Sequence, residues 1–400
     1  MNPALLIILS MGHLVTDVSQ GALPALNLFL VEKLKLTYFQ VGLVSLSFTL
    51  CSAFIQPLFG YLSDRRRMTW LLPVSCLASG LGMALTGLAP VYVLLLGAVF
   101  LSGLGVAGFH PEGSKTAYYA SGRYNRGISM SIFSLGGNLG TGLGPMLAYL
   151  LVGSGHLSHT IYLVGPGLVM AVFFGASLRS VNRVITAAGA VSRPSGASAG
   201  AIRTPAWPVG LLLGYVTVRA WTQAGMMYYI PFYLTGVAGT TRSSASLTLS
   251  AFLIAGALGT ILGGLVADRW SGKTGLISSM LLALIFSFLF LNTTGVLNVF
   301  AAAFSGLAII STFPTTVVYG QRLMPDKVGV ASGLMLGFAI GMGSVGVLLL
   351  GLVADHFGLV STMHIIALFP LLGLVLSLLL PIPAQEKALL AEKRTKVQPV

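Results

Sequence analysis

Four side chains that are charged at neutral pH lie inside long apolar runs of this 400-residue chain. Asp17 and Glu112 are the acidic members of this set, and Lys115 and Arg219 are the basic members. A charged residue at the centre of an apolar helix costs about 2.5 to 3.5 kcal/mol on membrane-insertion scales. Each of the four is therefore expected to face protein or water, where carboxylates exchange protons and cations attract anions.

Asp17 has a second titratable group close to it in the sequence. His13 precedes it by one helical turn, so the two side chains lie on the same face of a helix. This pair is predicted to bind and release a proton as its surroundings change. The alternative is a static ion pair between Asp17 and Arg219 that only holds two parts of the chain together.

A second group of polar residues surrounds Pro111. His110 and Glu112 flank the proline, and Lys115 follows Glu112 by three residues on the same helical face. A proline inside a helix frees a backbone carbonyl and favours a kink that exposes polar groups to water. We predict that His110 and Glu112 relay protons, and the alternative is an internal Glu112–Lys115 pair that ends the span.

Arg219 and Gln223 lie one turn apart and form a donor-rich face suited to a phosphonate or a carboxylate. The alternative role of Arg219 is that of a counter-ion for Asp17. The Met and Tyr residues at 226–229 either line a pliable pocket or only pack against other helices. The predicted substrate-binding residues are His13, Gln20, Lys115, Arg219, Gln223 and Tyr228.

Membrane helices are the elements that must position these residues. Hydrophobic residues make up 55% of the chain and charged residues 8%, against about a quarter charged in soluble domains. A spanning helix takes about 20 apolar residues, and the 50 glycines suit close packing between such helices. Breaks between apolar runs predict an all-α membrane protein with twelve spans, near 4–30, 38–62, 69–88, 91–118, 127–152, 160–178, 207–233, 245–267, 275–291, 296–320, 328–354 and 360–381.

The spans are expected to form two six-helix bundles. A segment rich in Ala, Ser, Gly and Arg divides them, as a flexible linker would. The predicted parts are an N-terminal bundle at 1–179, a cytoplasmic linker at 180–206, a C-terminal bundle at 207–382 and a cytoplasmic tail at 383–400.

The basic residues predict how the chain is oriented. Lys and Arg concentrate in the segments that lie inside if both termini are cytoplasmic. With that orientation the outer segments carry only Lys33, Lys35 and Arg242. The net charge of +13 is therefore interpreted as a topology signal, and nucleic-acid binding is not expected.

A short phrase at the end of the second span recurs in the second half of the chain. Gly60-Tyr61-Leu62-Ser63-Asp64-Arg65 corresponds to Gly264-Leu265-Val266-Ala267-Asp268-Arg269, and Gly351-Leu352-Val353-Ala354-Asp355 closes the eleventh span on the opposite side. Internal repeats in a membrane protein are typical of secondary transporters.

Six plus six helices with this phrase resemble the major facilitator superfamily, whose signature between helices 2 and 3 is Gly-x-Leu-Ala-Asp-Arg. The resemblance implies that the glycines allow close helix approach and that the charged residues bridge the two halves. Helix 5 also carries Gly140-Thr141-Gly142-Leu143-Gly144-Pro145, which resembles an antiporter motif, with Ala148 and Tyr149 where that motif has further glycines. The residues implied in gating and bending are Gly60, Asp64, Arg65, Gly140, Gly144, Pro145, Gly264, Asp268, Arg269 and Asp355.

Further phrases resemble the fosmidomycin-resistance branch of this superfamily. They are Gly12-His13-Leu14-Val15-Thr16-Asp17, Phe109-His110-Pro111-Glu112-Gly113-Ser114-Lys115 and Arg219-Ala220-Trp221. The resemblance implies a proton-driven exporter with a central cavity lined by helices 1, 4, 7 and 10. All four buried charges lie on helices 1, 4 and 7. Val99 occupies the position of an arginine found in helix 4 of drug exporters, so proton coupling must use other groups.

We therefore expect a proton-coupled exporter of small drug-like or anionic molecules that works by alternating access. An uptake symporter of a small organic anion or sugar would use the same parts and remains the alternative. A membrane enzyme is disfavoured because the sequence has no metalloprotease, nucleophile-elbow or phosphate-loop motif. Cys51 and Cys76 are interpreted as small hydrophobic residues, and neither a metal nor a cofactor is expected. The expected partners are a small-molecule substrate, protons and membrane lipid, with the protein a monomer in the inner membrane.

Overall fold

The computed structural model describes residues 3–51, 55–66, 68–120, 126–189, 206–324, 328–383 and 386, and this part of the chain is helical without strands. The first half contains α1 (Pro3–Leu34), α2 (Tyr38–Leu50), α3 (Gln56–Arg65), α4 (Leu71–Thr86), α5 (Tyr92–Ala120), α6 (Arg126–Val152), the 3-10 helix η2 (Leu157–Leu163) and α7 (Val164–Gly189). The second half contains α8 (Ala206–Gly236), α9 (Arg242–Arg269), α10 (Gly272–Leu291), α11 (Gly295–Ser311), α12 (Phe313–Leu323) and α13 (Val328–Leu379).

Each of the twelve predicted spans has a counterpart among these helices, which confirms the all-α fold. The second span comprises α2 and α3, and the tenth comprises α11 and α12, which meet at Thr312. The last two spans lie in α13, where the chain turns at Gly358 with a φ of 80°, a conformation that glycine adopts without strain. Helix α7 continues to Gly189, past the predicted end of the first bundle at residue 179.

The outer surface of the helices is apolar, as expected for contact with lipid. Eight helical segments of the described chain are long and apolar enough to cross a membrane. Large side chains such as Val93, Phe173 and Leu265 are exposed on them. In water such a surface would favour association with other apolar surfaces, whereas in a bilayer it contacts acyl chains.

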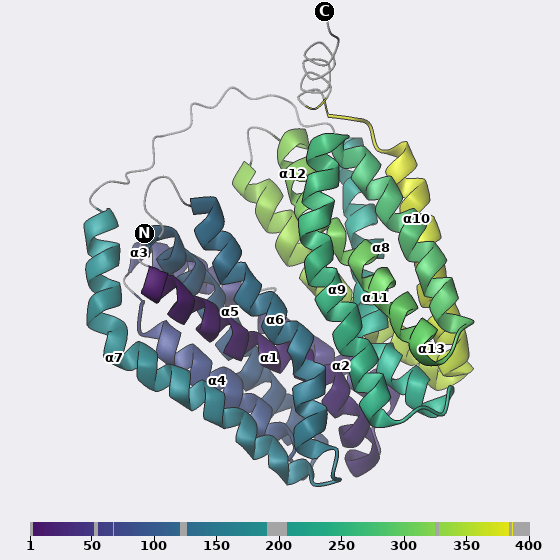
Figure 1. Cartoon of the computed structure of the whole chain (residues 1–400), viewed down its shortest axis with the longest axis horizontal. Coiled ribbons are helices and arrows are strands. Elements are labelled where there is room, and N and C mark those ends of the chain that lie inside the picture. Colours follow the sequence, from purple (N-terminus) through teal and green to yellow (C-terminus); the bar gives the residue numbers. More distant parts are fainter. Residues whose placement is uncertain are drawn as a thin grey trace, which may run out of the picture.

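The order of helix packing in the first half is repeated in the second. In the first half α1 packs along α6, and α4 packs against both α5 and α7. In the second half α8 packs along α13, and α10 packs against both α11 and α13. Each helix of a packed pair in the first half corresponds to the helix six spans later in the second half, so the two halves are pseudo-symmetric. Figure 1 shows the first-half helices together on one side and the second-half helices on the other.

The two halves meet along two seams, α2 with α13 and α6 with α9. At the end of the seam predicted to be outside, the Asp355 carboxylate accepts hydrogen bonds from the backbone N–H groups of Tyr38 and Phe39 at 2.7 and 2.9 Å. Glu32 and Arg242 form an exposed ion pair near the same end. At the opposite end, α3 packs against α5 and α12 packs against helices of its own half.

Candidate functional site

Asp17 is the centre of a cluster of titratable side chains. It is 6% exposed on α1. Its Oδ2 lies 3.2 Å from His13 Nε2, and its Oδ1 lies 2.9 Å from His110 Nε2 on α5. The structure therefore brings together three of the predicted proton-coupling and binding residues. The three side chains are close enough to one another to form a single cluster.

The hydrogen bond made by the other ring nitrogen of His13 indicates that a proton lies between His13 and Asp17. His13 Nδ1 is 2.8 Å from the carbonyl oxygen of Phe133, which is an acceptor, so this nitrogen carries a proton. Nε2 of a neutral ring would then face the carboxylate with a lone pair. The 3.2 Å contact is favourable only if a proton lies between Nε2 and Oδ2, whichever of the two groups formally carries it.

Helices α5 and α6 hold the cluster in place. The Phe133 ring stacks on the His13 ring at a centroid distance of 4.2 Å, and the His110 ring meets it edge-on at 4.9 Å. Gly137 on α6 leaves the space that the polar atoms occupy, because a Cβ there would lie 2.4 Å from His13 Nε2 and 2.8 Å from Asp17 Oδ2. Gly137 was not among the predicted site residues, although the Gly136-Gly137 pair in the sequence was a visible signal of close approach.

Glu112 and Lys115 form a separate cluster, the internal pair of the alternative interpretation, while His110 contacts Asp17. Glu112 is fully buried, accepts a hydrogen bond from Ser63, and lies 3.1 Å from Lys115 Nζ. Lys115 Nζ also donates to the Ser63 carbonyl oxygen at 2.6 Å. The cluster therefore ties α5 to the end of α3. Helix α5 continues through Pro111 without an interruption.

Arg219 is a buried cation on α8, 2% exposed. Its Nη1 donates to Gln223 Oε1 at 2.9 Å, and its guanidinium carbon lies 5.3 Å from the centre of the Phe313 ring. Its Nε has no hydrogen-bond partner among the described atoms. No described carboxylate forms an ion pair with Arg219, so the alternative in which it pairs statically with Asp17 is wrong for this conformation.

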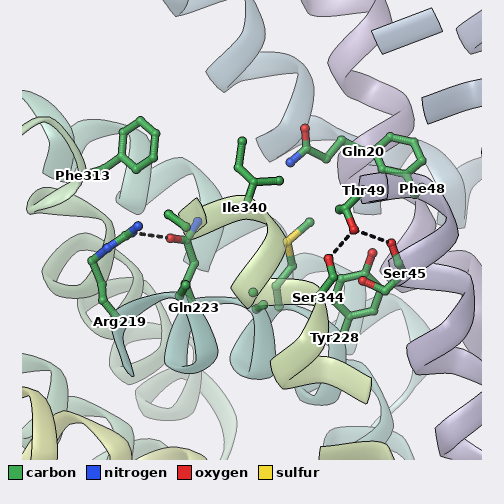
Figure 2. A pocket seen from close by; sticks show the side chains of 15 residues that line it. Gln20, Ser45, Phe48, Thr49, Arg219, Gln223, Tyr228, Phe313, Ile340 and Ser344 are labelled. Carbon is green, nitrogen blue, oxygen red and sulfur yellow. Dashed lines mark hydrogen bonds between the residues drawn. The ribbon is translucent and has the colours of Figure 1, made fainter. Parts of the chain in front are cut away.

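Arg219 lines a cavity between the two halves. Helices α1 and α2 contribute to it from the first half, and α8, α12 and α13 contribute from the second. Figure 2 shows Arg219 and Gln223 on one side of the cavity and Thr49 and Ser344, which are hydrogen-bonded to each other, on the other side. The lining residues are Gln20, Ser45, Phe48, Thr49, Arg219, Ala220, Gln223, Ala224, Met227, Tyr228, Phe313, Ala339, Ile340, Gly343 and Ser344.

The cavity contains four of the six predicted substrate-binding residues, namely Gln20, Arg219, Gln223 and Tyr228. His13 instead belongs to the Asp17 cluster, and Lys115 to the Glu112 cluster. Thr49 and Ser344 were missed because they lie on helices 2 and 11, which the resemblance did not assign to the cavity. A hydroxyl group inside an otherwise apolar run was the available signal.

The motif glycines differ in how closely they approach other helices. A Cβ on Gly140 would lie 2.2 Å from the Leu14 carbonyl oxygen, and one on Gly144 would lie 2.5 Å from the backbone of α1. A Cβ on Gly60 would make only an ordinary contact, and one on Gly264 would meet nothing within 4 Å. The expectation of close approach at these last two positions is therefore wrong in this conformation.

The other motif residues are placed as follows. Pro145 is buried within α6, and Asp355 contacts the start of α2 across the halves. Arg269 is exposed, with its guanidinium 5.4 Å from the ring centre of Trp270. The side chains of Asp64, Arg65 and Asp268 lie outside the described residues.

The ligand atoms of His13, Asp17 and His110 lie within 4.8 Å of one another, a spacing that a metal ion could also bridge. The contacts of Asp17 with His13 and His110 have hydrogen-bond lengths.

The solved structures with this fold include two membrane transporters of different kinds. A bacterial homologue of the human lysosomal transporter Spinster, solved in an inward-facing, occupied conformation, superposes with a TM-score of 0.78, covering 94% of this chain and 96% of that chain at 15% identity. A D-xylose–proton symporter superposes with a TM-score of 0.68, covering 95% and 97% of the two chains at 15% identity. At these identities the likeness shows the fold alone.

Two bacterial proteins are more similar to this chain in sequence than these two solved structures are. The fosmidomycin resistance protein of Escherichia coli K12 is 34% identical over 383 residues, covering 93% of this chain and 91% of its own length. An uncharacterised MFS-type transporter of Bacillus subtilis is 32% identical over 94% of this chain and 92% of its own length. The family described as Major Facilitator Superfamily matches residues 9–341 and 239–400. The chain therefore belongs to the major facilitator superfamily, a family of multi-pass membrane transporters of small molecules.

Proposed function

We propose that the protein exports small drug-like or anionic molecules in exchange for protons by alternating access, and that it is not an enzyme. The observation that carries this proposal is Arg219, a buried cation in the cavity between the halves that has no carboxylate partner among the described side chains. An uncompensated buried charge is costly, and a bound anion would supply the missing opposite charge. The name of the relative from Escherichia coli, a fosmidomycin resistance protein, supports export over uptake.

The Asp17 cluster is the proposed proton site. Gln20 lines the Arg219 cavity and follows Asp17 by three residues on α1, so the two sites share one helix. A change in the protonation of Asp17 or His110 changes the net charge of the cluster on one side of α1. An anion bound at Arg219 changes the net charge of the cavity that Gln20 of α1 lines. Protons and substrate would therefore favour different conformations of the same two halves. Glu112 is proposed as a second proton site nearer the cytoplasmic end of α5.

The closed end of the seam supports an inward-facing conformation. Asp355 joins α13 to the start of α2 at the end predicted to be outside, and Glu32 pairs with Arg242 near it. Gating by the repeated motifs would then join the cytoplasmic ends in the opposite conformation. We further propose the two bundles at 1–179 and 207–382 joined by a cytoplasmic linker, cytoplasmic termini, and a monomer surrounded by lipid in the inner membrane.

Transport of fosmidomycin in proteoliposomes tests the proposal. With an imposed pH gradient, the protein should move fosmidomycin in the direction opposite to protons. Asp17→Asn should abolish gradient-driven transport, because the cluster loses its ionisable carboxylate. Arg219→Ala should weaken fosmidomycin binding by about ten- to hundredfold, since a hydrogen bond to a charged group contributes about 1.5 to 3 kcal/mol.

Two exposed positions supply matched controls. Glu32→Gln makes the same carboxylate-to-amide change, and Arg183→Ala removes an exposed arginine of α7. Arg183→Ala should transport like the unmodified protein, and Glu32→Gln, which removes only an exposed ion pair, should keep gradient-driven transport. Movement of fosmidomycin in the same direction as protons would show a symporter. Undiminished transport by Asp17→Asn, or undiminished binding by Arg219→Ala, would reject the role proposed for that residue.

A further inference from the structure

An apolar slit lies between α2 and α13, beside the Arg219 cavity. Its walls are formed by Leu46, Thr49 and Leu50 of α2 and by Gly337, Phe338, Gly341, Met342 and Val345 of α13. Leu50 is 38% exposed, so the slit is accessible from outside the packed helices. Two of the α13 residues are glycines, and a Cβ on Gly337 would meet nothing within 4 Å. The slit is therefore open space that side chains of ordinary size would fill.

The slit and the cavity adjoin each other along the same pair of helices. Thr49 lines both of them. On α13, Ile340 and Ser344 face the cavity, while the residues that follow them, Gly341 and Val345, face the slit. The hydrogen bond between Thr49 and Ser344 lies at this boundary. Figure 2 shows Thr49 and Ser344 on the side of the cavity away from Arg219, and Thr49 also lines the slit, so a ligand in the cavity has an apolar space next to it on that side.

The two spaces together are complementary to an amphiphile, with a charged group at one end and apolar side chains at the other. One end offers the Arg219 guanidinium, with Gln223 beside it and no carboxylate among the described side chains to neutralise it. The other end offers Leu46, Phe338 and Met342, which bind apolar chains and exclude charge. A small compact anion would use only the first end.

We infer that the preferred substrates are organic anions with an apolar chain, whose head group binds Arg219 and whose chain occupies the α2–α13 slit. This inference rests on the proposed function, because it assigns the anion to Arg219.

The second seam between the halves, α6 with α9, has no such connection to the Arg219 cavity. Its pocket lies between α6 and α9, with Leu135, Asn138 and Leu258 among its lining residues, and it shares no lining residue with the Arg219 cavity.

Binding of two phosphonates of different chain length to the protein in lipid nanodiscs tests the inference, with empty nanodiscs measured to subtract partition into lipid. Each methylene group transferred from water to an apolar site strengthens binding by about three- to fourfold. Hexylphosphonate should therefore bind at least about tenfold more tightly than methylphosphonate. Gly337→Leu should remove this difference and leave methylphosphonate binding unchanged, because its side chain fills only the slit.

Gly97→Leu is the matched control, since a Cβ on this exposed α5 glycine also meets nothing within 4 Å. It should keep the chain-length difference. Leu50→Gln, on the opposite wall, makes the slit polar without filling it and should reduce the difference even if Gly337→Leu does not fold. Arg219→Ala should weaken the binding of both phosphonates.

Equal affinity of the unmodified protein for the two phosphonates would overturn the inference. A lipid chain that permanently fills the slit would give this result. The anion site at Arg219 would remain supported. A chain-length difference that persists in both slit variants would overturn the inference as well. Failure of the unmodified protein to bind either phosphonate would instead reject the anion site itself, and with it the proposed function.

Discussion

At the scale of single residues, Glu112 shows how one buried carboxylate can serve either structure or proton transfer. Its Oε2 contacts Ser63 and Lys115, while its Oε1 has no hydrogen-bond partner among the described atoms. Glu112→Gln leaves the Lys115 charge unpaired, and breaking a buried pair costs about 3 to 5 kcal/mol. We expect a lower unfolding temperature and a several-fold loss of pH-driven transport.

The double variant Glu112→Gln/Lys115→Met separates the two roles, because it removes both charges. Its unfolding temperature should return close to that of the unmodified protein. Its pH-driven transport should stay low while substrate counterflow without a gradient continues. Recovery of pH-driven transport together with stability would mean that Glu112 and Lys115 form only a static pair.

At the scale of elements, the glycines of α6 set the distance between α6 and α1. A Cβ on Gly137 would collide with the ends of the His13 and Asp17 side chains, whereas a Cβ on Gly140 would lie 2.2 Å from a backbone oxygen of Leu14. Gly137→Ala should therefore abolish the pH dependence of transport with little loss of stability. Gly140→Ala should destabilise the protein by about 1 to 3 kcal/mol, because two backbones must separate.

Thermal unfolding and the pH profile of transport, measured on both variants, check this prediction. Gly97→Ala is the control, since a Cβ there contacts nothing within 4 Å. If Gly137→Ala kept the pH profile of the unmodified protein, the contact between His13 and Asp17 would have no part in coupling.

At the scale of the whole molecule, Asp355 connects the halves at one end. Its carboxylate accepts two backbone hydrogen bonds at the start of α2, where the helix dipole favours negative charge. A contact of this kind contributes about 1 kcal/mol, so Asp355→Asn should shift the population about fivefold toward the conformation that is open at this end. Double electron–electron resonance, with spin labels at Lys35 and Ala238, measures this shift as a change in the distribution of distances between the labels.

The Glu32–Arg242 pair provides the comparison, because it joins two exposed side chains, whereas the Asp355 carboxylate accepts hydrogen bonds from two backbone N–H groups. Surface pairs of this kind contribute about 0 to 1 kcal/mol, so Glu32→Gln should shift the label distances less than Asp355→Asn does. Equal and small effects of the two variants would show that Asp355 does not control the closure.

Much of this protein could be predicted from the sequence, for a physical reason. Whether a segment enters a bilayer depends on about 20 consecutive residues, so the twelve spans were visible one by one. The cost of burying charge singled out Asp17, Glu112, Lys115 and Arg219 in the same local way. The resemblance to the superfamily rested on short motifs within single helices, and the comparisons confirmed it.

Only the tertiary structure decided which of these charges meet. His110 contacts Asp17 although 93 residues separate them, while Glu112, two residues further along, contacts Ser63 and Lys115 instead. No carboxylate in the described part of the chain pairs with Arg219, and the opposite wall of its cavity includes Thr49 and Ser344. Hydropathy and motifs report the environment along one helix, whereas these pairings depend on how helices distant in the sequence are rotated and spaced against each other.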